Sequence, residues 1–280
     1  NDFQPDIIMG ISAGALNSAF LVNESAKMNG SLHWPEIGKA LTAFWTEEIR
    51  HPQDLIYRQG FLRHAWRIIR KRFNGYYDHE PLVSKVKEKL NHEQMKKSPV
   101  DLIVGAVDWV EGGMTYASQK NQDIVDYIIA SASMPFILPS WPIGESLFID
   151  GGIRDIVPIR KLIECDIEEV VIILTQAAGL PLADIKEAGS IASFAERVVE
   201  LVSHEILEND ISQLRKINRD LSETEDRELK PLSRLLDKRL IKHTVIRPAQ
   251  TYEFSLQNFC QEDIQMMIED GFQAAQIYEG

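Results

Sequence analysis

The chain has 280 residues, of which 44% are hydrophobic and 26% are charged, proportions that are ordinary for a soluble globular protein. Its formal net charge is −12, which disfavours nucleic acid as a partner because the phosphates would be repelled overall. No run of about 18 apolar residues is present, so the sequence predicts no segment that crosses a bilayer. Two distant cysteines, Cys165 and Cys260, and the lack of a recognisable signal peptide lead us to expect a cytoplasmic protein.

Short apolar runs alternate with longer amphipathic segments along the chain. The sequence predicts strands at residues 5–10, 100–110, 114–118, 146–150, 169–175 and 243–248. It predicts helices at residues 11–28, 35–50, 60–73, 80–90, 122–133, 189–217 and 262–278. Because apolar strands that alternate with helices form a parallel sheet covered on both faces, we expect an α/β fold, with one domain over residues 1–280.

Several element boundaries have a local signal. Pro35 suits the first turn of a helix, and Asp78 is a candidate cap for the helix that follows it. Residues 111–113, Glu-Gly-Gly, separate two apolar runs and predict a hairpin. The helix at residues 122–133 must end before Pro135, because the residue that precedes a proline disfavours the helical conformation.

A serine lies between two glycines near the start of the chain, where residues 5–20 read PDIIMGISAGALNSAF. Ser12 stands at the point where an apolar strand ends and a helix begins. A nucleophilic serine must project beyond its backbone, and a sharp strand-to-helix turn achieves this. Such a turn crowds the backbone, which explains Gly10 and Gly14 two residues to either side. Ala13 opens a helix whose positive end would favour an oxyanion.

The alternative for Ser12 is a structural one. Serine is a common N-cap residue, and a turn bounded by glycines needs no catalytic role. The placement of this turn after an apolar strand and before a helix is the context that the nucleophile motif requires. We therefore interpret Ser12 as a candidate nucleophile.

A serine nucleophile also needs a base, which is a histidine oriented by a carboxylate in most hydrolases with this turn. None of the seven histidines lies in a small-residue turn after an apolar strand, and His243 is interpreted as structural or exposed. Asp150 is a better candidate, because it ends a predicted strand and active sites lie beyond the carboxyl ends of parallel strands. Gly151 and Gly152 follow it and let the backbone approach closely and turn. The alternative is an ordinary Asp-Gly turn.

Three motifs support a family resemblance: GISAG at residues 10–14, ASASMPFILP at 130–139 and DGGIRDIVPI at 150–159. In order and spacing they resemble those of the patatin-like phospholipases. The resemblance implies a three-layer α/β/α sandwich around a mostly parallel sheet. It also implies a catalytic dyad, with Ser12 as nucleophile and Asp150 as general base, and an acyl-serine intermediate. Neither a metal nor a cofactor is implied, and the expected partner is a lipid acyl ester substrate.

The sequence departs from the family pattern in two respects. Family members carry a Gly-rich turn upstream of the serine, whose amides form the oxyanion hole, and this chain begins too close to Ser12 to contain it. Either a longer natural N-terminus carries the turn or the protein has lost activity; we expect the former. In addition, Ile156 and Leu138 stand where an asparagine and an aromatic residue are frequent in the family.

One basic segment has two interpretations. The residues from 58 to 73 carry six basic side chains and no acidic one, in a chain that is acidic overall. An amphipathic helix of this kind suits contact with an anionic membrane surface, or a lid over an acyl pocket. It also suits an ordinary surface helix whose arginines pair with carboxylates. We slightly prefer this second interpretation.

Two further functions remain as alternatives. The first is an α/β-hydrolase with a triad of Ser12, Asp150 and His243. The second is a non-catalytic lipid-binding protein with a decayed site. Composition and motifs do not determine the acyl chain, the head group or the oligomeric state.

Overall fold

The computed structural model describes residues 3–28, 32–58, 60, 74–180, 190–225, 241–252 and 255–277. The helix that the sequence predicts at residues 60–73 lies outside the described residues except for Gly60. No helix among the described residues is long and apolar enough to cross a membrane.

The strands form one mixed sheet and two smaller pairs. The main sheet contains β1 (Ile7–Ile11), β4 (Asp101–Asp108), β5 (Met114–Ser118), β6 (Trp141–Ile143) and β7 (Ser146–Asp150). Its order is β1-β4-β7-β6, with β5 also paired to β4. The pairs are β2 (Tyr57–Arg58) with β3 (Tyr77–Asp78), and β8 (Glu169–Ile173) with β9 (Lys242–Ile246). The β1–β4 and β8–β9 pairs are parallel, and the other pairs are antiparallel.

The strands β1 and β7 both pair with the same edge of β4. Residues 106–107 of β4 pair with both β5 and β7, so these two strands lie on opposite edges of β4. Residues 103–105 pair with both β5 and β1, which places β1 on the edge opposite β5. Along that edge β1 ends opposite Gly105, and β7 arrives from the other direction and ends opposite Ala106. The carboxyl ends of β1 and β7 therefore meet head to head.

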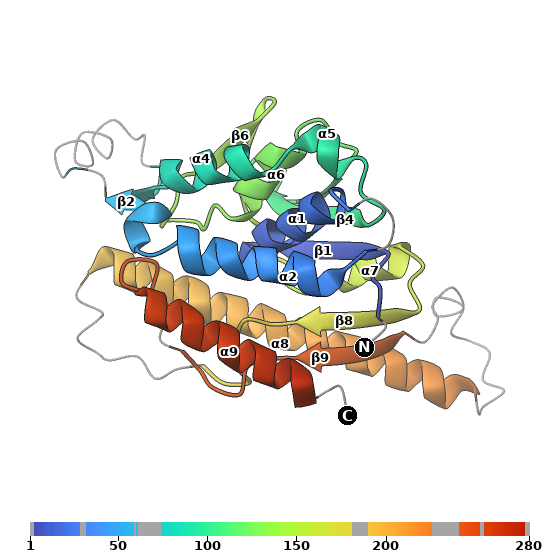
Figure 1. Ribbon diagram of the computed structural model, residues 1–280. Coiled ribbons are helices and arrows are strands. Elements are labelled where there is room, and N and C mark those ends of the chain that lie inside the picture. Colours follow the sequence, from blue (N-terminus) through green and yellow to red (C-terminus); the bar gives the residue numbers. More distant parts are fainter. Residues whose placement is uncertain are drawn as a thin grey trace.

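Helices account for most of the described residues outside the strands. They are α1 (Ala13–Ser25), α2 (Trp34–Ala43) with a π-helical turn (Phe44–Glu48), α4 (Glu80–Lys89), α5 (His92–Met95), α6 (Ile124–Ser131), α7 (Ile159–Glu164), α8 (Ile191–Glu225) and α9 (Gln261–Ile277). A 3₁₀ turn, η3 (Gly151–Ile153), follows β7 directly. In Figure 1, α1, α4, α5 and α6 gather in the upper part of the view, and α8 and α9 lie in the lower part beside β8 and β9.

The side chains of β1 show why helices cover both faces. Because successive residues of a strand point to opposite faces, Ile8 and Met9 enter different cores. Ile8 packs against the cluster that contains buried residues of α1 and α6, such as Ala15 and Ile128. Met9 packs against a second cluster, which is formed by residues of α7, β8 and α8 and includes Leu207 of α8. The layered α/β architecture expected from the sequence is therefore present, with a core on each face of β1.

Several local predictions can be compared with the structure. The hairpin around residues 111–113 is confirmed, since β4 and β5 pair antiparallel on either side of it. The prediction that Asp78 is the N-cap of α4 was wrong, because His79 occupies that position; Asp78 Oδ1 instead accepts a hydrogen bond from the Glu80 amide (3.1 Å).

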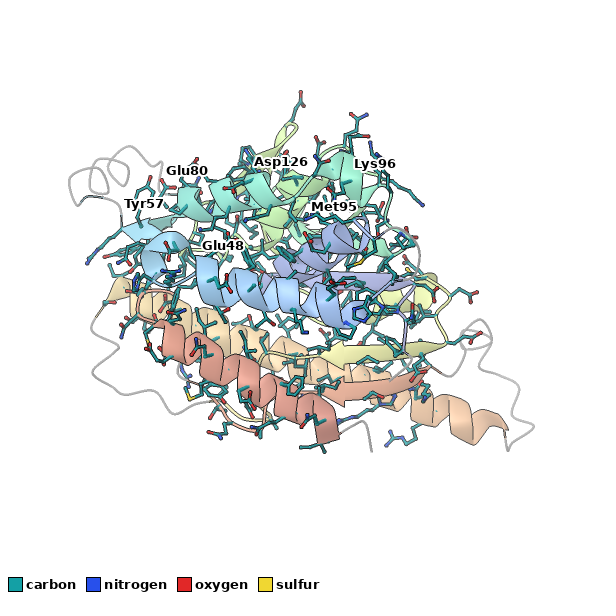
Figure 2. All side chains as sticks on the ribbon, viewed as in Figure 1. Glu48, Tyr57, Glu80, Met95, Lys96 and Asp126 are labelled. Atoms are coloured by element: carbon teal, nitrogen blue, oxygen red, sulfur yellow. The ribbon has the colours of Figure 1, made fainter. Side chains whose placement is uncertain are left out.

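The strand β6 was not predicted. It is tied to α6 by the Trp141 indole, which donates to Asp126 Oδ1 at 2.9 Å (Asp126 is labelled in Figure 2).

Candidate active site

Ser12 lies between the end of β1 and the start of α1. Its backbone has φ 55° and ψ −129°, a conformation that is sparsely populated by residues other than glycine. Ser12 is formally the N-cap residue of α1, but its side chain makes no capping hydrogen bond. The capping interpretation therefore does not explain the hydroxyl, which points elsewhere.

The Ser12 hydroxyl donates a hydrogen bond to Asp150. Ser12 Oγ lies 2.6 Å from Asp150 Oδ2, although 138 positions separate the two residues along the chain. Asp150 is only 4% exposed. Its other oxygen, Oδ1, accepts the Gly152 amide at 2.7 Å, and its own amide donates to the Ser133 carbonyl at 3.0 Å. Both the carboxylate and the main chain of Asp150 are thus held in place.

The position of Asp150 arises in a different way from the one expected. The sequence interpretation placed Asp150 at the carboxyl edge of a parallel sheet, but β7 is antiparallel to β4. Ser12 and Asp150 come together because β1 and β7 run toward each other along one edge of β4 and end at neighbouring residues, Gly105 and Ala106. The site therefore lies where two strands meet, within the span of β4.

Burial changes the acidity of Asp150. Removal from water disfavours the charged carboxylate and raises the pKa of Asp150 from 3.8 to about 6. Hydrogen bonds from the Ser12 hydroxyl and the Gly152 amide stabilise the carboxylate and lower the pKa in part. Asp150 is consequently a stronger base than an exposed aspartate, and it remains largely ionised at neutral pH.

The two glycines of the serine motif differ in their surroundings. A side chain on Gly10 would place its first carbon 2.2 Å from the Gly14 carbonyl oxygen and 2.6 Å from Ser18 Oγ. Only glycine fits there, as the crowding argument predicts. At Gly14 the same carbon would meet nothing within 4 Å. The steric explanation for Gly14 was therefore wrong.

The glycines after Asp150 also differ. A side chain on Gly151 would bring its first carbon to 2.7 Å from the Gly105 carbonyl oxygen, so close approach of two backbones requires a glycine. On Gly152 the nearest atom would be Asp150 Oδ1, at 3.1 Å, which is tight but less severe. Neither glycine has a positive φ, so both serve close packing and not a left-handed turn.

The main chain of Ser12 has a partner that the sequence did not reveal. The Ser12 amide donates to Ser131 Oγ at 2.9 Å, and the same hydroxyl donates to the Gly105 carbonyl at 2.6 Å. Ser131 belongs to the motif at residues 130–139, and no role for its hydroxyl was predicted from the sequence. No role was predicted for Gly105 either. A side chain on Gly105 would place its first carbon 2.4 Å from Ile11 Cδ1, so the Ile11 side chain would have to move.

His243 is not part of this arrangement. It lies in β9, and its Nδ1 is 2.9 Å from the Asn218 side-chain nitrogen of α8. The Ser12 hydroxyl bonds directly to Asp150, whereas a triad would place the histidine between them. The geometry does not support the triad of Ser12, Asp150 and His243. Within the described part of the chain, no cluster of three or more His, Cys, Asp or Glu side chains could hold a metal ion.

Comparison with known protein families identifies the family of the chain. The family model described as patatin-like phospholipase matches residues 2–163, a span that contains both Ser12 and Asp150. The chain belongs to the patatin-like phospholipase family. Patatin-like proteins generally hydrolyse lipid esters. The family resemblance that the three motifs indicate is thus confirmed, and so is the patatin-type fold.

Among solved structures, this patatin-like chain is similar to VipD from Legionella pneumophila, with 12% identity and a TM-score of 0.36. The similarity covers 98% of this chain and 61% of the VipD chain. The chain therefore spans about three fifths of the length of that relative. A search of curated proteins finds no match.

Proposed function

We propose that this protein is a serine hydrolase that cleaves lipid acyl esters with a dyad of Ser12 and Asp150. The observation that carries the proposal is the 2.6 Å hydrogen bond from Ser12 Oγ to the buried Asp150 carboxylate, in a chain of a lipid-hydrolysing family. The strained backbone of Ser12 supports it, because strain of this kind is retained where function requires a fixed side-chain direction.

The first half of the reaction transfers the acyl group to the enzyme. Asp150 accepts the hydroxyl proton as Ser12 Oγ attacks the ester carbonyl carbon, and a tetrahedral oxyanion forms. The carbonyl re-forms as the bond to the leaving alcohol breaks, and protonated Asp150 gives its proton to that alcohol. The product of this half-reaction is an acyl-serine, with Asp150 again ionised.

The second half regenerates the serine. Asp150 takes a proton from a water molecule, whose oxygen attacks the acyl carbon. The collapse of the second tetrahedral species breaks the bond to Ser12 Oγ, and Asp150 returns the proton to that oxygen. A carboxylate with a pKa of about 6 can serve in both halves, since it is ionised at neutral pH and still basic enough to accept a proton.

The helix α1 supports the charge that develops during both halves. It begins at Ala13, directly after the nucleophile. The first amides of a helix have no partner within the helix, and its N-terminal end carries a partial positive charge. This end favours a tetrahedral oxyanion formed next to Ser12.

The substrate class follows from the base and the family together. A carboxylate is a weak acid–base catalyst, so an alcohol is a more suitable leaving group than an amine. We therefore propose phospholipids, lysophospholipids or related lipid esters as substrates, in line with the family to which the chain belongs.

A fluorophosphonate probe tests the proposal, because it bonds covalently to an activated serine. The expected result is labelling of the wild-type protein at Ser12, complete loss of labelling in Ser12→Ala, and release of fatty acid from phosphatidylcholine vesicles by the wild type alone. A folded wild-type protein that takes up no probe would contradict the proposal and favour a lipid-binding protein with a decayed site.

A further inference from the structure

We infer that Ser131 is a positioning residue for the nucleophile: its hydroxyl fixes the main chain of Ser12 in the strained conformation that directs Oγ toward Asp150. The consequence for catalysis rests on the function proposed above. The structural part of the inference, that the Ser131 hydroxyl holds the Ser12 amide, stands independently of any activity.

The hydroxyl of Ser131 joins two backbone groups at the end of a strand pair. Ser131 is the last residue of α6 and has no exposed surface. Its Oγ accepts the Ser12 amide at 2.9 Å and donates to the Gly105 carbonyl at 2.6 Å. The last residue pair of the β1–β4 ladder is Ile11 with Gly105. The hydroxyl thus connects the two strands where direct pairing stops and the chain turns away at Ser12.

This connection opposes the relaxation of a strained residue. A non-glycine residue with φ 55° and ψ −129° persists only where its surroundings fix it. Without the Ser131 hydroxyl, the amide of half-buried Ser12 and the carbonyl of buried Gly105 would both lose a hydrogen-bond partner. Ser12 would then gain freedom to turn toward an ordinary conformation, and Oγ would move with the backbone.

The end of α6 holds the second member of the dyad as well. The Ser133 carbonyl, two residues after Ser131, accepts the Asp150 amide at 3.0 Å. The Ser133 hydroxyl is bonded within its own turn, to the Ile129 carbonyl at 2.9 Å. One short segment therefore sets the position of Ser12 through a side chain and that of Asp150 through the main chain. The separation of Oγ and Oδ2 depends on this segment.

A matched control exists at the opposite end of α1. Ser25 is also without exposed surface, and its hydroxyl likewise makes two hydrogen bonds. It donates to the Val22 carbonyl at 2.8 Å and shares a bond of 2.8 Å with the Ser98 hydroxyl. Replacement of Ser25 by alanine removes an equally buried hydroxyl with the same number of partners, far along the helix from the nucleophile.

Two measurements on Ser131→Ala and Ser25→Ala test the inference. The first is the rate of fluorophosphonate labelling at Ser12, together with kcat and KM for p-nitrophenyl butyrate. We expect Ser131→Ala to reduce the labelling rate and kcat by at least about tenfold, since a small misplacement of a reacting group has an effect of this order. KM should stay within about twofold, and Ser25→Ala should change none of the three by more than about twofold. Ser131→Thr, which keeps the hydroxyl, should recover most of the rate.

The second measurement is hydrogen exchange of the Ser12 amide, followed in peptides that cover residues 9–16. Exchange should be faster in Ser131→Ala than in the wild type, and unchanged in Ser25→Ala. A wild-type labelling rate in Ser131→Ala, an equal loss in both alanine variants, or an unchanged exchange rate at Ser12 would overturn the inference.

The two proposals fail in distinguishable ways. If the wild type takes up no probe, the proposed function fails, and the exchange measurement alone decides the role of Ser131. If the wild type is labelled and Ser131→Ala is labelled equally fast, only the role of Ser131 fails. Should Ser131→Ala not fold, Ser131→Cys replaces it, because a thiol has nearly the same shape but weaker hydrogen bonds. An intermediate rate is then expected, and a wild-type rate overturns the inference.

Discussion

Ser12 and Asp150 stand at the ends of two strands that run toward each other along one edge of β4, and their side chains are joined by a hydrogen bond of 2.6 Å. The meeting point is crowded with backbone, which explains Gly10 before Ser12 and Gly151 after Asp150. Main-chain atoms of β1, β4 and the turn after β7 surround the two side chains.

The glycines of the serine motif should respond differently to alanine. In Gly10→Ala the new carbon would lie 2.2 Å from the Gly14 carbonyl oxygen, so the turn must shift. We expect a loss of about 2 kcal/mol or more in the free energy of unfolding, since forced overpacking typically costs this much, and a loss of labelling at Ser12. Gly14→Ala should be as stable as the wild type or more stable by up to about 1 kcal/mol, because alanine is the better helix former. Urea unfolding of the two variants measures the contrast, and equal stabilities would contradict it.

The strain at Ser12 can be measured by comparison of two variants that lack its hydroxyl. Ser12→Gly and Ser12→Ala both remove the hydroxyl, so they lose the same hydrogen bond to Asp150. They differ in the cost of a positive φ, which glycine tolerates and alanine does not. The glycine variant should be more stable by about 1 kcal/mol or more, measured by chemical denaturation. If alanine proves equally stable, the backbone at Ser12 carries no strain.

The raised pKa of Asp150 predicts that stability depends on pH. Because the carboxyl binds its proton more tightly in the folded state, its contribution to stability is complete below the unfolded pKa of 3.8 and is lost as the pH rises through about 6. Asp150→Asn has nearly the same shape and does not ionise. Relative to this variant, the wild type should lose about 2 kcal/mol of unfolding free energy between about pH 4 and about pH 7. A difference that is constant across this range would show that the pKa of Asp150 is not raised.

His243 should have no effect on the reaction. It lies in β9 and is bonded to Asn218, whereas the Ser12 hydroxyl is bonded to Asp150. His243→Gln should therefore label with the probe at a rate within about twofold of the wild type. A tenfold loss with an unchanged melting temperature would restore a histidine to the mechanism.

Much of the site could be predicted because its key residues carry local signals. The apolar run before Ser12 and the helix after it predict a sharp turn from which the serine projects, and the glycines after Asp150 predict close packing at a strand end. These signals depend on neighbours within a few residues. The same reasoning predicted the β4–β5 hairpin, whose turn is also local.

The rest of the site depends on contacts between distant segments, which no local pattern contains. The role of the Ser131 hydroxyl depends on Gly105 and Ser12, which lie 26 and 119 positions away along the chain. The antiparallel pairing of β7 with β4 joins segments about 40 positions apart, and β6, which forms a hairpin with β7, has only three residues and gave no recognisable period. At Gly14 the sequence pattern predicted a crowding that is absent, because the pattern cannot show which backbone atoms face a given residue.

The pH dependence of probe labelling at Ser12 tests the dyad most directly. In the proposed mechanism ionised Asp150 accepts the proton, so the rate should rise with pH and level off, with a midpoint near the pKa of about 6. In Asp150→Asn the rate should fall by at least about a hundredfold and lose this dependence, since general base catalysis contributes on that order. A variant that keeps the wild-type rate and midpoint would contradict the assignment of Asp150 as the base.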